Sequence, residues 1–214
     1  MLRVLRRFGH QPVLVQGATC CGQPAWNTGL DGPAREVARR TLRALTGTAG
    51  PVVVPSGSCA TMMREFWPEL FRGTGDHGAA VAIAERVVEL SAFLEPGAGE
   101  PVPGGERVAY HDSCHMLREL GVHSAPRRLL GAAGFEVVEV GHAELCCGFG
   151  GTFSVKLPEI STAMADEKLD AVAACGVRRL VGSDLSCLLH LQGRAERRGL
   201  ELQAVHLAEV LDDA

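Results

Sequence analysis

The sequence predicts an α/β protein that consists of two similar halves, each built on a parallel sheet. The first observation is a cysteine pair followed by glycine, which occurs as Cys20-Cys21-Gly22 and again as Cys146-Cys147-Gly148. The second is a single cysteine, Cys59 or Cys187, that follows each pair at nearly the same distance. Positions repeated in this way indicate an internal duplication. The third is that strand-like and helix-like segments alternate, which is typical of parallel sheets covered by helices.

The first half begins with a helix and contains two short strands. We expect a helix at Met1–Phe8, a strand at Gln11–Gln16, a helix near Gly32–Leu45 and a strand at Val52–Val54, with Cys59 after it. No segment corresponds to the first strand and the first cysteine of the second half. The first half is therefore expected to lack its first strand, and the chain to be N-terminally incomplete through a misassigned start or a natural truncation.

The segment between the two halves changes in composition. Gly78–Leu94 is rich in Ala and Val with helical periodicity and is expected to pack on the first half. The run EPGAGEPVPGGE that follows is rich in Gly and Pro, which is typical of a linker. The expected organisation is a first domain at 1–95, a linker at 96–105 and a second domain at 106–214.

The second half gives the clearer pattern. Glu106–Tyr110 is expected to form a strand that leads into the segment HDSCH at 111–115. Ser124–Ala133 has a proline near its start and Gly134 after its end, which predicts a helix. Phe135–Val140 alternates between apolar and polar residues and predicts the next strand.

The remaining elements of the second half place its cysteines together. A loop carries the segment 146–151, and Pro158–Cys175 has the apolar spacing of a long helix. Arg179–Gly182 is expected to form a strand, with Cys187 just beyond it. Ligands of parallel sheets gather at the carboxyl ends of the strands. Cys114, the cysteine pair and Cys187 all follow strands, so the sequence predicts one site there.

Composition narrows the class of protein. Hydrophobic residues make up 46% of the chain and charged residues 21%, which are ordinary values for a globular protein. A net charge of −4 argues against nucleic-acid binding through a basic surface. No apolar run approaches the roughly 20 residues that span a bilayer, and the N-terminus lacks the apolar core of a signal peptide. We expect a cytoplasmic protein.

The eight cysteines favour metal or cluster ligation over disulfides. The cytosol keeps thiols reduced, and adjacent cysteines are poor partners for each other. Two ligand sets follow from the duplication: the first cysteine site contains Cys20, Cys21 and Cys59, and the second cysteine site contains Cys114, Cys146, Cys147 and Cys187. Zinc competes with an iron–sulfur cluster because four thiolates suit tetrahedral zinc, although the short knuckles typical of zinc sites are missing.

Several neighbours of the cysteines have more than one interpretation. The glycines of 148–151 either let the backbone approach inorganic sulfide and donate N–H groups to it, or only form a tight turn. Their spacing does not match a dinucleotide loop. His111 and His115 flank Cys114 and either hydrogen-bond to a bound cluster, carry protons or lie on the surface. Cys175 is expected to be a small buried apolar residue and not a ligand.

Five motifs resemble one family. They are CCGQPAWNTG at 20–29, PSGSC at 55–59, HDSCHMLREL at 111–120, CCGFGGTFSVK at 146–156 and HLAEVL at 206–211. Together they resemble the cysteine-rich CCG domain of heterodisulfide reductases and of iron–sulfur proteins in glycolate-, glycerol-3-phosphate- and lactate-oxidising systems. The resemblance covers essentially the whole chain and is strongest to the iron–sulfur component of bacterial L-lactate oxidation complexes, which has two CCG domains.

This resemblance implies tandem CCG domains and an oxidoreductase role. The chain would be an electron-transfer subunit of a complex that oxidises L-lactate to pyruvate, with iron–sulfur clusters, expected to be [4Fe–4S]. Its partners would be other subunits, including a further iron–sulfur protein. Catalytic residues are not implied. The family's last motif commonly has two cysteines, and Leu185 stands where the earlier one is expected. Three thiols then remain in the first cysteine site, which would be labile, empty or completed by a partner, and four in the second.

Two other functions remain open at the level of sequence. One is a different CCG-domain reductase that acts on a disulfide, glycolate or glycerol-3-phosphate. The other is a non-catalytic metal-binding assembly subunit, which Leu185 and the missing first strand would favour.

Overall fold

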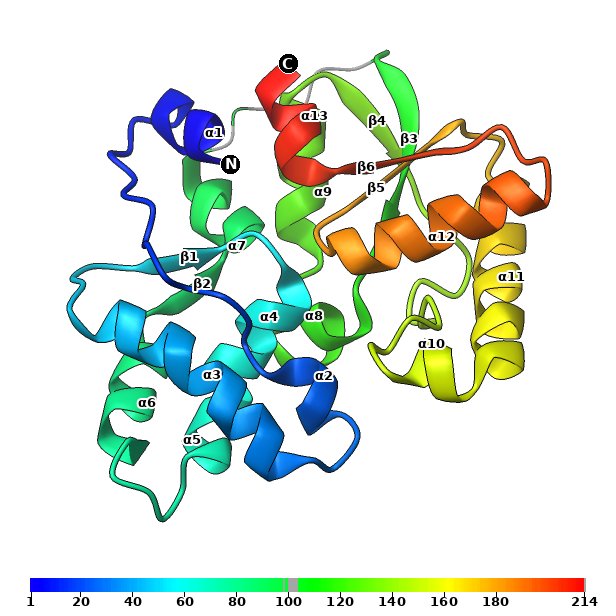
Figure 1. Ribbon diagram of the computed structural model, residues 1–214. Coiled ribbons are helices and arrows are strands. Elements are labelled where there is room, and N and C mark those ends of the chain that lie inside the picture. The colour runs from blue at the N-terminus through cyan, green and yellow to red at the C-terminus, as the bar shows by residue number, and fades with distance from the viewer. Residues whose placement is uncertain (98, 100–103, 214) are drawn as a thin grey trace.

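Two parallel sheets organise the computed structural model, which describes residues 1–97, 99 and 104–213 (Figure 1). The smaller sheet pairs β1 (Val52–Val54) with β2 (Val87–Glu89). The larger sheet has the strand order β4–β3–β5–β6, parallel throughout. Its strands are β3 (Glu106–His111), β4 (Phe135–Val138), β5 (Arg179–Gly182) and β6 (Gln203–His206). The predicted α/β class with two parallel-sheet halves is confirmed.

Helices cover both sheets. Those of the first half are α1 (Leu2–Arg7), α2 (Gln23–Trp26), α3 (Asp31–Thr46), α4 (Gly57–Thr61), α5 (Trp67–Leu70), α6 (His77–Ala84) and α7 (Leu90–Leu94), with a π-helical turn at Met62–Phe66 and a 3-10 turn at Glu95–Gly97. Those of the second half are α8 (Cys114–Glu119), α9 (Ser124–Ala132), α10 (Phe153–Lys156), α11 (Pro158–Ala174), α12 (Leu185–Arg197) and α13 (Leu207–Asp213). None of the described helices is long and apolar enough to cross a membrane.

The predicted strand at Gln11–Gln16 is wrong. This segment is irregular and largely exposed. In the second half the corresponding strand, β4, pairs along its whole length with β3. The described residues of the first half contain no strand equivalent to β3, so the backbone of Gln11–Gln16 has no ladder to join. A strand pattern without a neighbouring strand does not form a stable sheet edge.

The expectation of helical structure throughout Gly78–Leu94 is also wrong. Helix α6 ends at Ala84, β2 follows, and α7 begins at Leu90. Val87 and Val88 are β-branched residues that pair with Val52 and Val53 of β1. A three-residue strand is too short for its alternation to stand out against the flanking helical pattern.

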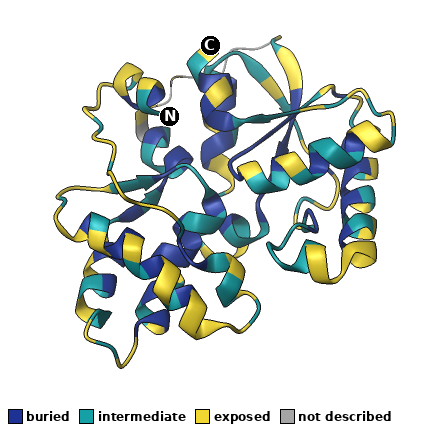
Figure 2. Cartoon of the chain, viewed as in Figure 1, coloured by how far each residue is buried: buried dark blue, intermediate teal, exposed yellow. Residues whose placement is uncertain are grey.

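The two halves share one of the three cores. Side chains alternate along a strand, so those of β3 lie in two cores. Val108 and Tyr110 lie in a core with α9 and α13, and Ala109 lies in a core with α11 and α12. Helices α1 and α7 of the first half join the α9–α13 core, and Figure 2 shows buried residues along α7, α9 and α13. Of the predicted linker, residues 98 and 100–103 lie outside the described residues, and the domain boundaries remain a prediction.

Candidate metal centres

The first cysteine site forms where the loop before α2 meets α4. The thiol of Cys21 lies 3.4 Å from Sγ of Cys59, which stands in α4 directly after β1. The backbone N–H of Gly22 donates to Sγ of Cys20 at 3.4 Å. All three thiols predicted for this site therefore come from one corner of the first half.

The second cysteine site brings all four predicted thiols together in two pairs. The thiol of Cys114, at the start of α8, lies 3.9 Å from Sγ of Cys146. The thiol of Cys147 lies 2.9 Å from Sγ of Cys187, in the first turn of α12. The N–H groups that follow the pair donate to Cys146 and Cys147 at 3.4 Å each. All eight cysteines of the chain are free thiols.

Glycine follows each cysteine pair because a helix backbone passes too close for a side chain. Gly22 and Gly148 have φ of +90° and +86°, in the left-handed region that favours glycine. A Cβ atom on Gly22 would lie 2.6 Å from the carbonyl oxygen of Ala34 in α3, and one on Gly148 would lie 2.4 Å from that of Ser161 in α11. The same contact in both halves explains why the motif is CCG in each.

A buried polar residue on the same helix anchors each cysteine loop. Thr41 of α3 donates to the carbonyl oxygen of Cys20 at 2.9 Å and accepts from the N–H of Thr19 at 3.0 Å. Lys168 of α11 is fully buried and donates to the carbonyl oxygen of Ala143 at 3.0 Å. Burial lowers the pKa of the Lys168 ammonium. Sequence reasoning missed both residues, although their similar distances from the CCG pairs carried a signal.

Contacts between the thiols shift the pKa values of the cysteines of the first site in opposite directions. Cys21 donates to both of its neighbours, which raises its own pKa. The contact with Cys21 lowers the pKa of Cys20 to about 6 and also lowers the pKa of Cys59. At neutral pH this site therefore presents thiolate character beside a protonated thiol.

The second site is polarised in the same way. The contacts with Cys114 and Cys147, together with the N–H of Gly148, lower the pKa of Cys146 to about 2. The contact with Cys147 lowers the pKa of Cys187 to about 7. The pKa values of the two donors, Cys114 and Cys147, are raised by these same contacts and by burial. Thiolates are the form of cysteine that binds metals, and ligation would release the remaining thiol protons.

The two histidines beside Cys114 differ in their surroundings. His111 is 1% exposed, and one of its ring nitrogens lies with Sγ of Cys147 and Sγ of Cys187 in a group whose three atoms are all within 4.8 Å of one another. His115 faces the first half, where Nδ1 lies 2.7 Å from Nε2 of Gln23. Neither is a free surface residue.

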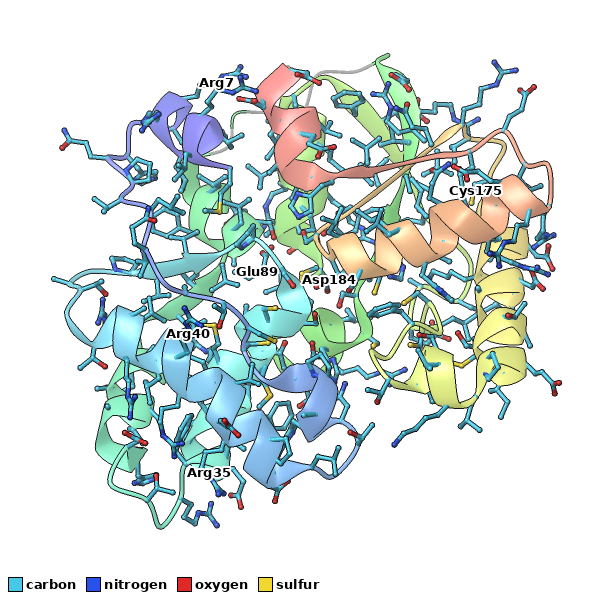
Figure 3. All side chains as sticks on the ribbon, in the orientation of Figure 1. Arg7, Arg35, Arg40, Glu89, Cys175 and Asp184 are labelled. Carbon is cyan, nitrogen blue, oxygen red and sulfur yellow. The ribbon has the colours of Figure 1, made fainter. Side chains whose placement is uncertain are left out.

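Asp184 joins the two halves between the cysteine sites. This buried residue stands at the N-cap position of α12. Its carboxylate does not cap that helix and instead accepts from the hydroxyls of Ser56 and Ser58, the latter at 2.7 Å, and from the N–H of Ser58 at 3.1 Å. Ser56 caps α4, the equivalent helix of the first half. Figure 3 shows Asp184 near Glu89 in the middle of the molecule. Sequence reasoning missed this contact because it joins residues far apart in the chain.

Two further positions discussed from the sequence are Leu185 and Cys175. Leu185 is 54% exposed at the start of α12, so its side chain does not fill a ligand position. The thiol of Cys175 donates to the carbonyl oxygen of Ala171 at 3.3 Å and packs against the α11–α12 core. Cys175 is only partly buried, so the expected burial is incomplete, although its side chain packs against a core.

The donor set of the second site fits a thiolate-bound metal group. Four cysteines converge, two backbone N–H groups point at their sulfur atoms, and a glycine turn lets the backbone approach. Soft thiolates select iron–sulfur clusters and zinc over hard cations such as magnesium and calcium. N–H donors to sulfur are a usual feature of iron–sulfur sites.

Comparison with known proteins identifies the family of the chain. The cysteine-rich domain named CCG matches residues 1–64 and 108–192. Lactate utilization protein A of Geobacillus sp. (strain WCH70) is 40% identical over 99% of this chain and 90% of its own length. The protein of the same name from Geobacillus kaustophilus is 42% identical with the same coverage, and Lactate utilization protein A 2 of Bacillus cereus (strain Q1) is 37% identical over 99% and 89%. The chain therefore belongs to the cysteine-rich CCG domain family.

Proposed function

We propose that the protein acts in lactate utilisation, as an iron–sulfur electron-transfer subunit of a cytoplasmic complex that oxidises L-lactate to pyruvate. The observation that carries this proposal is the convergence of the four thiols of the second cysteine site with two N–H donors. Relatives named for lactate utilisation, similar along nearly the whole chain, support the substrate.

The residues of the second site would hold the group and keep it in a defined environment. Cys146 and Cys187 offer thiolates, and Cys114 and Cys147 complete four ligands, which is the number a [4Fe–4S] cluster requires. Such a group supplies one-electron oxidation and reduction. Cys147 and His111 are almost fully buried, which limits water at the inner side of the site. Oxidation of lactate releases two electrons, so the complex needs partner subunits, including a further iron–sulfur protein, to bind the substrate and pass electrons on.

The first cysteine site has a different role in this proposal. It unites three thiols among the described residues, one fewer than the second site. We expect its occupancy to depend on a ligand from elsewhere, such as a partner subunit. Its metal content should therefore vary more between preparations than that of the second site.

Metal analysis of anaerobically purified protein tests the proposal. Iron and acid-labile sulfide, broad visible absorbance and a reversible redox couple are expected. Cys114→Ala and Cys146→Ala should each abolish the cluster of the second site, whereas the matched control Cys175→Ala should retain it. Stoichiometric zinc without iron would overturn the cluster, and iron without a reversible couple would favour an assembly subunit.

Growth of a deletion strain tests the substrate. Loss of growth on L-lactate with retained growth on glycolate and glycerol-3-phosphate is expected. The reverse pattern would assign the protein to a different CCG-domain reductase system.

A further inference from the structure

The side chain of His111 lies beside the second cysteine site because of its position in β3. His111 is the last residue of β3, and it pairs with Gly182 at the carboxyl end of β5. Alternation along β3 places it on the same side as Ala109, in whose core Cys147 is buried, and opposite to Tyr110. Cys187 lies in the first turn of α12, the helix that follows β5, so the strand register brings the imidazole close to the thiols.

The imidazole of His111 is buried without a protein partner. It is 1% exposed, and neither Nδ1 nor Nε2 has a hydrogen-bond partner among the described residues. A neutral imidazole carries one N–H donor, and a buried donor without an acceptor is unfavourable. One of the ring nitrogens of His111 lies within 4.8 Å of both Sγ of Cys147 and Sγ of Cys187.

The buried imidazole beside the thiols distinguishes the second site from the first. Gly182 lies close to His111, since a Cβ atom there would lie 3.5 Å from Cβ of His111 and 3.1 Å from Cδ2 of Leu188. The residue equivalent to Gly182 in the first half is Val54, at the end of β1. Among the described residues, no imidazole is grouped in this way with Cys21 and Cys59. The two sites therefore offer different environments to the same kind of ligand.

We propose that His111 donates its ring N–H to the Cys187 thiolate when the second site is loaded, and thereby raises the reduction potential of the group bound there. The inference rests on the proposed iron–sulfur function. Reduction adds negative charge that is shared with the ligand sulfur atoms, so an N–H donor stabilises the reduced state more than the oxidised state. His111 is thus a positioning residue that acts through Cys187, not a ligand.

Potentiometric titration of the anaerobically loaded full-length protein tests this role. His111→Leu should keep the iron and sulfide content of the wild type but titrate at a lower potential. His111→Gln, whose amide retains an N–H donor, should give a value between the two. His10→Leu, which replaces an exposed histidine that contacts Phe93, should titrate like the wild type.

Three outcomes would overturn the inference, and they separate it from the proposed function. An unchanged potential in a fully loaded His111→Leu protein would remove the tuning role and leave the cluster in place. Loss of iron in both His111 variants, restored by His111→Cys, would make residue 111 a ligand. Wild-type protein without iron and sulfide would remove the proposed function together with the inference. If His111→Leu does not fold, His111→Gln decides. A reduction potential below that of the wild type supports the inference, and an equal potential overturns it.

Discussion

The side-chain nitrogen Nε2 of Gln23 lies 2.7 Å from Nδ1 of His115 and so links the two cysteine sites. Gln23 begins α2 immediately after the first CCG, and His115 follows Cys114 of the second site. A second contact lies close by, since a Cβ atom on Gly151 would approach Cβ of Pro24 to 3.1 Å. The loops around the two sites are therefore in direct contact, and a change in one half is expected to reach the ligands of the other.

Replacing Gln23 by Leu should destabilise the protein. The change removes one hydrogen bond and leaves His115 without its partner, which should lower the free energy of unfolding by about 1 kcal/mol. Urea denaturation measures this value, with the exposed Gln16→Leu as the matched control. A double-mutant cycle with His115→Leu should give a coupling energy of similar size. Equal stability of the Gln23 and Gln16 variants would show that the contact contributes nothing.

Replacing Gly148 by Ala should disrupt the second site. The left-handed backbone alone costs about 1–3 kcal/mol for a residue with a side chain, and the added Cβ atom would lie 2.4 Å from the carbonyl oxygen of Ser161. We expect lower stability together with a loss of bound metal, measured by denaturation and metal analysis. Gly193→Ala is the matched control, because Gly193 lies within α12 with nothing near its Cβ position. A Gly148→Ala protein as stable as wild type would contradict the close approach.

Helices and strands could be predicted where the residues that determine them lie within or next to the segment itself. In the second half, β3, β4, β5, α9 and α11 were predicted to within about two residues, because their apolar periodicity and flanking Pro and Gly residues are encoded nearby. No prediction covered α8, α10, α12, β6 and α13. Val52–Val54 and α3 of the first half were predicted as closely as β3. Gln11–Gln16 was not, because whether a strand forms depends on a neighbour that the pattern of the segment itself does not contain.

In the candidate site too, some features could be predicted from the sequence and others depend on residues far apart in the chain. The grouping of the cysteines could be predicted because a duplicated spacing identifies positions that the fold brings together. The contact of Asp184 could not, since this residue acts on a segment far from it in the chain and has no recognisable motif. Burial of His111 depends on the register between β3 and β5, which sequence alone left open.

Replacing Asp184 by Ala should loosen the contact between the halves. The hydroxyl groups of Ser56 and Ser58 and the N–H of Ser58 would lose their shared acceptor in a buried place. Because bonds to a charged acceptor are among the stronger ones, we expect a loss of about 2 kcal/mol in unfolding free energy. The exposed Asp213→Ala serves as control. A loss that persists unchanged in a Ser56→Ala, Ser58→Ala background would argue against these bonds as its cause.

Glu89 should make stability depend on pH. Its carboxylate is 2% exposed at the end of β2, where one oxygen accepts from the N–H groups of Ser91 at 2.7 Å and Ala92 at 3.2 Å, and the other has no partner among the described residues. Burial raises the pKa of this carboxyl above its ordinary value of 4.5. At pH values between 4.5 and the raised pKa, the folded protein holds a proton on Glu89 that the unfolded chain has released. The free energy of unfolding therefore falls as the pH rises through this range.

Glu89→Gln isolates this effect, since it keeps an oxygen to cap α7 and cannot ionise. Urea denaturation of both proteins from pH 4.5 upward should show the wild type losing stability relative to Glu89→Gln as pH rises. All other titrating groups are common to the two proteins and cancel in the difference. A difference that stays constant over the whole pH range would mean that Glu89 keeps its ordinary pKa, and that the unpartnered oxygen is solvated in the folded protein.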